Sequence, residues 1–576
     1  MKLVLADYIA ALKEDQELDS FVVNLLKELD IIPLTVPQRG RQHGVDIAAV
    51  GPDFESASNI ETLFLFVIKQ GDFSRSNWNT GVNAIRPTLD EILDSYTPSS
   101  VPDRYGSLPK KIIVVTNGSM AQNVNMDWSG YTRNNSSSDR SYDFWGIDKL
   151  ILLAERAQFS ESLFPKDVQS MLRKSLALLD LAEYDYRHFY ALLDKLLELP
   201  EAGSGITKKE AIKKIRLINT CQSIVLYWAQ GYNNLKPALI ISERVLLNTW
   251  RWIEKNEYAL DAEIMREYFA ILRSKTDIDI KYFVKVKDAV LVEDGLAFTG
   301  QLEHTEYCLL TFEQIGFLSI MGLTQLWHAE VKMYHDEELF QEGQGHFRDA
   351  EIVADYLAQL IKNNPSSLYP KFDEHCIEIN LALILFYETG RFESAITWLN
   401  NLINYLSLNQ QLFGFFPLWI TDYEKLAEHY GSKNSPAPES SILLTILAEW
   451  SLIFKQYDGY YSLRYLSQHQ VKGINLQIWK PTKETEEFFY TQNAMHDSGA
   501  SKVSISLHEN YRNYLMEMTE ERATWNDEEG ISCIYKGPFV IAYMAFRHFR
   551  TYVFPLFWRR LFNSPFCFNK TLPGQP

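Results

Sequence analysis

Cysteine is scarce in this chain and never occurs in closely spaced pairs. The 576 residues include five scattered cysteines, and none of them belongs to a Cys-x-x-Cys pair. Structural zinc sites and disulfide-stapled domains both depend on regularly spaced cysteines. The sequence therefore supports neither, and a reducing cytoplasm is the expected location.

Long apolar runs are also missing. The longest, such as "LALILFY" and "LFLFVI", fall far short of the roughly 18 to 20 residues that a membrane span needs. The opening "MKLVLADYIAALKEDQELD" is interrupted by Asp7 and is followed by no small-residue cleavage pattern, so it is predicted to be an amphipathic helix and not a signal peptide. We expect a soluble protein with no membrane partner.

Positive charge is in deficit. The chain has 56 Lys and Arg against 74 Asp and Glu, a formal net charge of −18. Proteins that coat nucleic acid need clustered cations to meet the phosphates. Any nucleic-acid site must therefore be a local basic patch on an acidic body.

Several catalytic signatures are absent as well. The sequence contains no Walker A loop, no GxGxxG, no HExxH and no nucleophile elbow. Its 46% hydrophobic and 23% charged residues are nevertheless typical of a folded protein, and its length predicts about two to four domains.

The first 118 residues show an ordered succession of elements. Apolar residues at helical spacing predict a helix between Glu17 and Asp30, followed by a strand in "IIPLTV". Two further strands, "GVDIAAVG" and "TLFLFVIKQGD", are predicted to form a hairpin, and the second is apolar enough to be central in its sheet. A helix in "VNAIRPTLDEILDSY" and a buried strand in "KKIIVVTNG" complete the order.

This order, with Asp46 on the second strand and Lys69 at the end of the third, resembles the PD-(D/E)xK restriction-endonuclease-like fold, especially its Mrr-type branch. The landmarks that carry the resemblance are "GVD" and the strand that ends in Lys69, and it covers about residues 17 to 118. It implies an α/β nuclease domain followed by a large, mainly α-helical region.

The resemblance also implies roles for individual residues. Asp46 would be the first ligand of Mg²⁺ or Mn²⁺, and Lys69 would orient water or stabilise the developing charge. An acidic residue on the preceding helix often assists in the family, which makes Glu17 and Asp19 auxiliary candidates.

Val67 departs from the family pattern. It stands two residues before Lys69, where a second carboxylate would project from the same face of the strand. The carboxylate could have moved to Asp72 or Glu91, Gln70 could supply a carbonyl oxygen, or Asp46 could hold the metal alone with water and substrate phosphate.

The loops on both sides of the predicted site contain cationic and aromatic residues. Such residues are suited to phosphate contacts and base stacking. The predicted nucleic-acid-binding residues are Arg39, Arg41, His43, Gln70, Arg75 and Trp78.

The remainder of the chain is predicted to be mainly helical. Residues 119–142, rich in Asn and Ser, are predicted to be a linker or a flap, followed by a helical domain at 143–430. A second linker at 431–441 precedes a mainly helical region at 442–576. "GRFESAITWLNNL" resembles a tetratricopeptide-type helix, and "KYFVKVKDAVLV" has a β-like pattern.

Three functional hypotheses follow. The first is a metal-dependent nuclease, acting on double-stranded DNA in a prokaryotic antiviral defence system. Its helical region would sense a protein partner, regulate the nuclease or form a homo-oligomer. The second is a catalytically degenerate domain that only binds nucleic acid or protein. The third is a helical interaction protein with a small α/β cap.

Overall fold

The structure is a computed structural model of the whole chain. It describes all residues except 1–5, 7, 11, 36–43, 56–59, 80–83, 158–165, 182–183, 199–205, 298–303, 336–338, 420–425, 427–438, 482–484, 491–498, 501–504, 524–530, 555 and 563–576. The chain divides into two compact units, residues 1–234 and residues 235–576.

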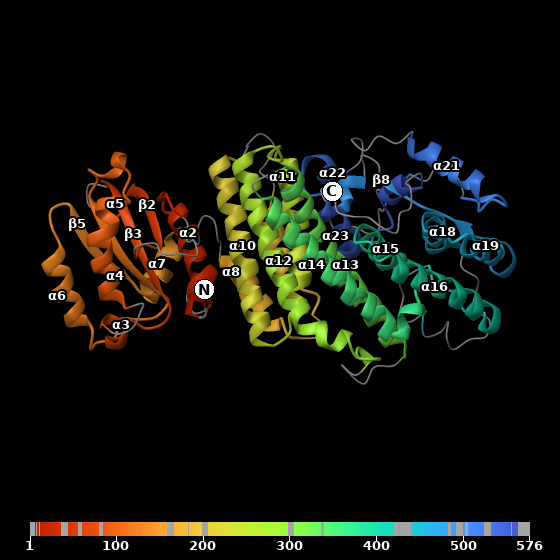
Figure 1. The fold of residues 1–576 in the computed structure, drawn as a ribbon, viewed down its shortest axis with the longest axis horizontal. Coiled ribbons are helices and arrows are strands. Elements are labelled where there is room, and N and C mark those ends of the chain that lie inside the picture. Colours follow the sequence, from red (N-terminus) through yellow and green to blue (C-terminus); the bar gives the residue numbers. More distant parts are fainter. Residues whose placement is uncertain are drawn as a thin grey trace. The chain divides into compact units, whose positions relative to one another are not determined.

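The first unit is built on a five-stranded mixed sheet in the order β1-β2-β3-β4-β5 (Figure 1). The first three strands are antiparallel to their neighbours, while β4 and β5 continue the sheet in parallel. The strands are β1 (Ile32–Pro33), β2 (Ile47–Pro52), β3 (Glu61–Lys69), β4 (Lys110–Thr116) and β5 (Arg140–Trp145). The predicted hairpin is confirmed as β2 and β3, and β3 lies at the centre of the sheet, as its apolar sequence predicted.

Helices cover both faces of this sheet. One face packs against α2 (Asp19–Glu28) and α7 (Ile147–Ala157) through residues such as Val22 and Leu153. The other face packs against α4 (Ile85–Glu91) and α6 (Asn125–Asn135) through residues such as Leu89. The predicted order of helix, three strands, helix and strand is therefore confirmed.

The remaining elements of this unit are short turns of helix around the sheet and three helices that follow it. They are η1 (Glu14–Leu18), α3 (Arg75–Asn79), η2 (Ile92–Tyr96), α5 (Thr97–Ser99), η3 (Asp103–Tyr105), α8 (Lys166–Leu178), α9 (Arg187–Leu196) and α10 (Lys208–Gly231).

Residues 119–142 do not form the predicted linker. They contain α6 and the first half of β5, a strand that pairs with β4 along its length. The segment is poor in aliphatic residues because α6 buries few side chains, chiefly Trp128 and Tyr131, and β5 lies at the edge of the sheet. The boundary between the units lies at residues 234 and 235, much later than the predicted boundary.

The second unit is mainly helical, as predicted. Its longer helices are α11 (Lys236–Lys255), α12 (Ala262–Val290), α13 (His304–His335), α14 (Phe340–Asn363), α15 (Cys376–Glu388), α16 (Phe392–Phe413), α18 (Leu443–Ile453), α19 (Tyr457–Tyr465), α21 (Tyr511–Ala523) and α23 (Val540–Phe549). Short elements connect them: η5 (Pro365–Leu368), η6 (Asp373–His375), β6 (Ser440–Ser441), η7 (Leu466–Gln470), β7 (Asn475–Leu476), β8 (Lys480–Pro481), α20 (Thr485–Phe489), β9 (Gly499–Ala500), α22 (Cys533–Lys536) and η10 (Phe557–Leu561).

Residues beyond 442 are part of the same unit, because α23 packs against α11, α13 and α15. Most of the predicted linker at 431–441 lies outside the described residues, and Ser440 and Ser441 form β6, which pairs with β7. Within the described part of the chain, one stretch, His304–Met333 in α13, is long and apolar enough to cross a membrane, and 78% of its most apolar window is buried.

Two helix hairpins of the second unit share one turn geometry. In the first, Thr389, Gly390 and Arg391 join α15 to α16, and in the second Phe454, Lys455 and Gln456 join α18 to α19. Gly390 and Lys455 both have positive φ angles, 75° and 57°. The N–H groups of Arg391 and Gln456 both donate to a carbonyl five residues earlier, which is the pattern of a Schellman cap. The unit therefore contains a repeated hairpin, while its tetratricopeptide-like character stays a prediction.

Candidate functional site

The sheet register brings Asp46 and Lys69 to one end of the first unit. Ile47, the first residue of β2, pairs with Phe66 near the end of β3, so the residue before β2 and the last residue of β3 lie close together. The Asp46 N–H donates to the Phe66 carbonyl at 2.9 Å, and Asp46 Oδ2 accepts from the Ile68 N–H at 2.7 Å. The two residues on which the nuclease prediction rests are thus neighbours.

A third residue, Glu14, joins them from η1. Lys69 Nζ lies 3.1 Å from Glu14 Oε1, and the Gln70 N–H donates to Glu14 Oε2 at 3.1 Å. One carboxylate therefore holds both the side chain at the end of β3 and the backbone that follows it. The sequence analysis named Glu17 and Asp19 for this role and missed Glu14.

The shape of η1 explains the difference. It is a π-helical turn, in which the Leu18 N–H donates to the Lys13 carbonyl five residues earlier. Such wide turns are common at functional sites. Because one turn contains an extra residue, its side chains point in other directions than they would on a regular α-helix. The only signal in the sequence is the acidic run "EDQELD", which contains four carboxylates without showing which one faces the sheet.

Glu17 and Asp19 have other surroundings. Glu17 Oε2 accepts from the Lys13 N–H at 3.0 Å at the start of η1. Asp19 is mostly buried, and its Oδ1 accepts from the Ser20 N–H at 2.7 Å. Asp19 still acts on the site through its charge, because it helps to raise the pKa of Asp46.

Electrostatics at this end of the sheet favour a cation. Burial raises the pKa of Asp46, the hydrogen bond from Ile68 and the charge of Lys69 lower it, and the charges of Glu14 and Asp19 raise it further. A positive ion that binds between carboxylates lowers the repulsion between them. Groups of carboxylates with a raised pKa often occur at functional sites.

Asn117, in the loop after β4, forms hydrogen bonds to two chain segments that border the site. Its Oδ1 accepts from the Gly71 N–H at 2.7 Å, and its Nδ2 donates to the carbonyls of Ala10 and Leu12 at 3.0 Å and 2.7 Å. The side chain is buried, and it fixes the chain on both sides of the pair formed by Lys69 and Glu14. Asn117 is therefore a positioning residue that the sequence analysis did not find.

Val67 is a core residue. It is fully buried and belongs to the cluster that packs β3 and β4 against α4, with Val114 and Leu89. The position that would supply a second ligand in the family therefore carries an apolar side chain that packs in the core and cannot bind a metal.

Asp72, one proposed replacement, lies in the loop after β3. Asp72 is exposed, and its Oδ1 accepts from the Ser119 N–H at 2.8 Å, which links the loops after β3 and β4. The two loops approach so closely that a Cβ on Gly118 would lie 2.5 Å from the Gly71 carbonyl carbon. This hydrogen bond of Asp72 joins two loops, and its role as a metal ligand stays a prediction. Glu91, the other proposed replacement, lies on α4, which covers the same face of the sheet as Val67, and its role as a ligand stays a prediction.

The predicted nucleic-acid-binding residues have mixed outcomes. Arg39, Arg41 and His43 lie outside the described residues. Gln70, which directly follows Lys69, and Arg75 are both exposed. Contact with a nucleic acid requires such exposure. The prediction for Trp78 is wrong, because its ring is buried against Phe73, Trp128 and Tyr131 and cannot stack on a base.

Other basic residues that could have met phosphates form ion pairs within their own unit. In the first unit, Lys209 and Arg216 pair with Asp30 and Glu28 at the end of α2. In the second unit, the arginines of "FRHFRTYVFPLFWRRLF" are mostly paired with carboxylates of the unit's interior. These pairs are Arg547 with Glu243, Arg550 with Glu374 and Glu378, and Arg559 with Glu449.

The donors at the site fit a hard divalent cation. Mg²⁺ prefers oxygen ligands, keeps several waters and is usually held by one or two carboxylates. Asp46 and Glu14 supply two, and each bonded carboxylate oxygen retains a further lone pair. Among the described residues no group of three or more His, Cys, Asp or Glu side chains could hold a metal, so water or substrate would have to complete the shell.

Comparison of the chain with protein-family models, curated proteins and solved structures found no match. The functional argument therefore rests on the geometry of this site.

Proposed function

We propose that the first unit is a metal-dependent nuclease whose site consists of Glu14, Asp46 and Lys69. The observation that supports this most strongly is the convergence of two carboxylates and one lysine at one end of the sheet. Hydrolysis of a phosphodiester needs that combination of a metal-binding oxygen set and a nearby cation.

Each residue has a distinct role in this proposal. Asp46 and Glu14 would hold Mg²⁺ or Mn²⁺, which would supply positive charge to the phosphate and activate water. Lys69, once its ion pair with Glu14 loosens, would orient the attacking water or neutralise charge on the phosphate. Asn117 would keep the strand end and the segment before η1 in register.

The proposed substrate is nucleic acid, with double-stranded DNA as the leading candidate. Because the chain carries a net charge of −18, contact with phosphates would be confined to the loops around the site, where Gln70 and Arg75 are exposed. Placement in a prokaryotic defence system, a protein partner of the helical region and homo-oligomer formation are proposed by analogy with the fold family.

The direct test is cleavage of plasmid DNA and of single-stranded RNA by the full chain with Mg²⁺ or Mn²⁺. Asp46→Asn and Lys69→Ala should each reduce cleavage by about 100-fold or more, because the first removes a metal ligand and the second removes a cation at the reacting phosphate. A matched control is Lys149→Ala, which removes a lysine of α7 that pairs with Glu55 and not with a residue of the site. Full cleavage by either site variant would contradict the proposal.

A second candidate is a catalytically degenerate domain that binds nucleic acid without cutting it. Two observations favour it: Val67 fills the second ligand position, and both Glu14 oxygens are already hydrogen-bonded. This candidate predicts retention of DNA by the full chain at low salt with no cleavage under any metal. A chain that neither binds nor cuts would instead match the third hypothesis, a helical interaction protein.

A further inference from the structure

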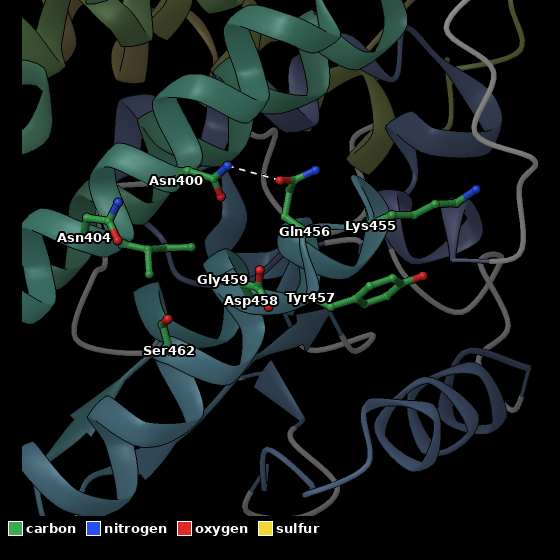
Figure 2. A pocket seen from close by; sticks show the side chains of 9 residues that line it. Asn400, Asn404, Lys455, Gln456, Tyr457, Asp458, Gly459 and Ser462 are labelled. Carbon is green, nitrogen blue, oxygen red and sulfur yellow. Dashed lines mark hydrogen bonds between the residues drawn. The ribbon is translucent and has the colours of Figure 1, made fainter.

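A polar cleft opens in the second unit between the second helices of the two repeated hairpins. It has a volume of about 380 Å³ and is lined by residues of α16 and by the start of α19 (Figure 2). The helices come close here because residue 459 is glycine: a Cβ on it would lie 3.1 Å from Ile403 Cδ1 and 3.2 Å from Ser451 Oγ. Asn404 of α16 and Ser462 of α19 point toward one another across the cleft (Figure 2).

The cleft contains hydrogen-bonding groups that have capacity for a ligand. Asn404, Asp458 and Ser462 are exposed, and within the described part of the chain their side chains make no hydrogen bond. Asn400 donates from Nδ2 to Gln456 Oε1 at 3.1 Å, so its Oδ1 can accept from a ligand. An amide and a hydroxyl can each donate and accept, which matches the N–H and C=O groups of a peptide bond.

The spacing of these groups matches an extended polypeptide. Asn400 and Asn404 are separated by four residues on α16, and Asp458 and Ser462 by four residues on α19. Four residues of α-helix advance about 6 Å along its axis. In an extended chain, groups that point the same way recur every two residues, at about 6.6 Å. Two facing rows at this spacing can therefore meet two successive pairs of main-chain groups.

The lining also excludes other ligand classes. Lys455 is the single cationic side chain among the residues lining the cleft, so a nucleic-acid backbone has no cluster of cations to meet. The apolar lining is limited to Ile403 and the ring of Tyr457, which is too little for a hydrophobic ligand. Asp458 is the single carboxylate among the lining residues and forms no ion pair within the described part of the chain, so it can pair with a positively charged group of a ligand.

From these observations we propose that the cleft binds an extended, basic segment of another protein through the segment's main chain. Asn400 and Asn404 hold one side of the segment, and Asp458 and Ser462 hold the other. Asp458 also pairs with a lysine or arginine of the segment. This inference stands apart from the nuclease proposal, because it uses only residues of the second unit.

The test begins with a phage library of randomised dodecapeptides, panned on the full-length chain. The synthetic form of the most enriched peptide is then titrated by fluorescence anisotropy. We expect the double variant Asn404→Ala/Ser462→Ala to bind it about tenfold more weakly, since two hydrogen bonds are lost. N-methylation of the peptide's central amides should weaken binding to a similar extent, while Asp458→Asn should weaken only peptides that contain a lysine or arginine.

The matched control is Asn401→Ala, which removes an exposed asparagine of α16 that does not line the cleft. Thermal melting confirms folding of every variant, and the substituted side chains are exposed, so the melting temperature should not change. No enriched peptide, equal affinity of the double variant, or insensitivity to N-methylation would each overturn the proposal. Binding of oligosaccharides on a glycan array with no peptide binding would also overturn it.

Discussion

At the residue scale, the candidate site contains two residues placed by strands, Asp46 and Lys69, and a third, Glu14, placed by a π-helical turn. Asp46 and Lys69 were found from the resemblance to the PD-(D/E)xK fold, and the register of β2 on β3 brings them together. Glu14 was not, because a π-helical turn of five residues gives no period that a sequence pattern reveals. Asn117 was also missed, since an asparagine after a strand usually indicates only a turn.

The burial of Val67 yields a test of how the site is completed. Val67→Asp restores the carboxylate of the family pattern, but it places a charge in a fully buried position packed by hydrocarbon. We expect it to destabilise the first unit by about 3 kcal/mol or more and to give no gain in cleavage. Denaturant unfolding measures the first effect and the plasmid assay the second.

The control for that substitution is Ile60→Asp, because Ile60 precedes β3 and is 50% exposed. It should change the free energy of unfolding by no more than about 0.5 kcal/mol. A stable Val67→Asp protein with increased cleavage would show that position 67 faces the metal and not the core.

At the element scale, the sequence predicted the type of strongly apolar elements well and that of mixed segments poorly. β3 and β4 are buried on both faces and were found from their apolar runs. "KYFVKVKDAVLV" has the alternation of a strand, yet all but its last two residues lie in the 29-residue helix α12, where packing against α11, α13 and α14 overrides local preference. α6 and β5 were taken for a linker because they bury few residues.

A pair of histidines makes the packing of α13 against α14 sensitive to acid. His328 stacks on His346 with ring centroids 5.0 Å apart, and its Nε2 lies 3.2 Å from Thr276 Oγ1. Burial above all, followed by the charges of His346, Lys332 and Arg273, lowers the pKa of His328 to about 3. Since the unfolded chain binds this proton near pH 6.5, the stabilisation is complete above that pH and is lost as the pH falls toward 3.

The expected contribution of His328 is a fall in unfolding free energy of about 1.4 kcal/mol for each pH unit below 6.5. Denaturant unfolding of wild type and His328→Gln between pH 7.5 and pH 5 should therefore give a shallower decline for the variant. His469→Gln, at an exposed position, should follow the wild type. Parallel curves for wild type and His328→Gln would show that His328 does not titrate on unfolding.

At the scale of the whole molecule, the second unit is closed by contacts that join its last residues to helices far earlier in the chain. Arg559 is fully buried, with Nη2 at 2.7 Å from Glu449 Oε1 and Nη1 at 2.8 Å from Glu521 Oε2. Glu449 also accepts from the hydroxyl of Tyr514 and the indole of Trp558. The sequence showed an arginine-rich aromatic segment, but the carboxylates that meet it are too distant in the chain to be predicted.

Removal of one member of this buried pair should strongly lower the free energy of unfolding of the second unit. Arg559→Ala leaves Glu449 charged and buried without its main partner, and we expect a loss of about 3 to 5 kcal/mol in the second unit. Arg560→Ala is the control, because its side chain is 63% exposed and lies 3.7 Å from Glu388, so the expected effect is about 0.5 kcal/mol or less. Calorimetry should show the shift in the transition of the second unit and not of the first. Equal melting of the two variants would contradict the assignment of Arg559 to the core.

The central claim is that Glu14 and Asp46 form one metal site beside Lys69. Electron paramagnetic resonance of Mn²⁺ titrated into the full chain tests it without any need for activity. We predict that Glu14→Gln and Asp46→Asn each bind Mn²⁺ about tenfold or more weakly than wild type, while Lys69→Ala and the distant Glu55→Gln retain it. Unchanged Mn²⁺ binding in Glu14→Gln would contradict the account, because the second carboxylate would then lie elsewhere.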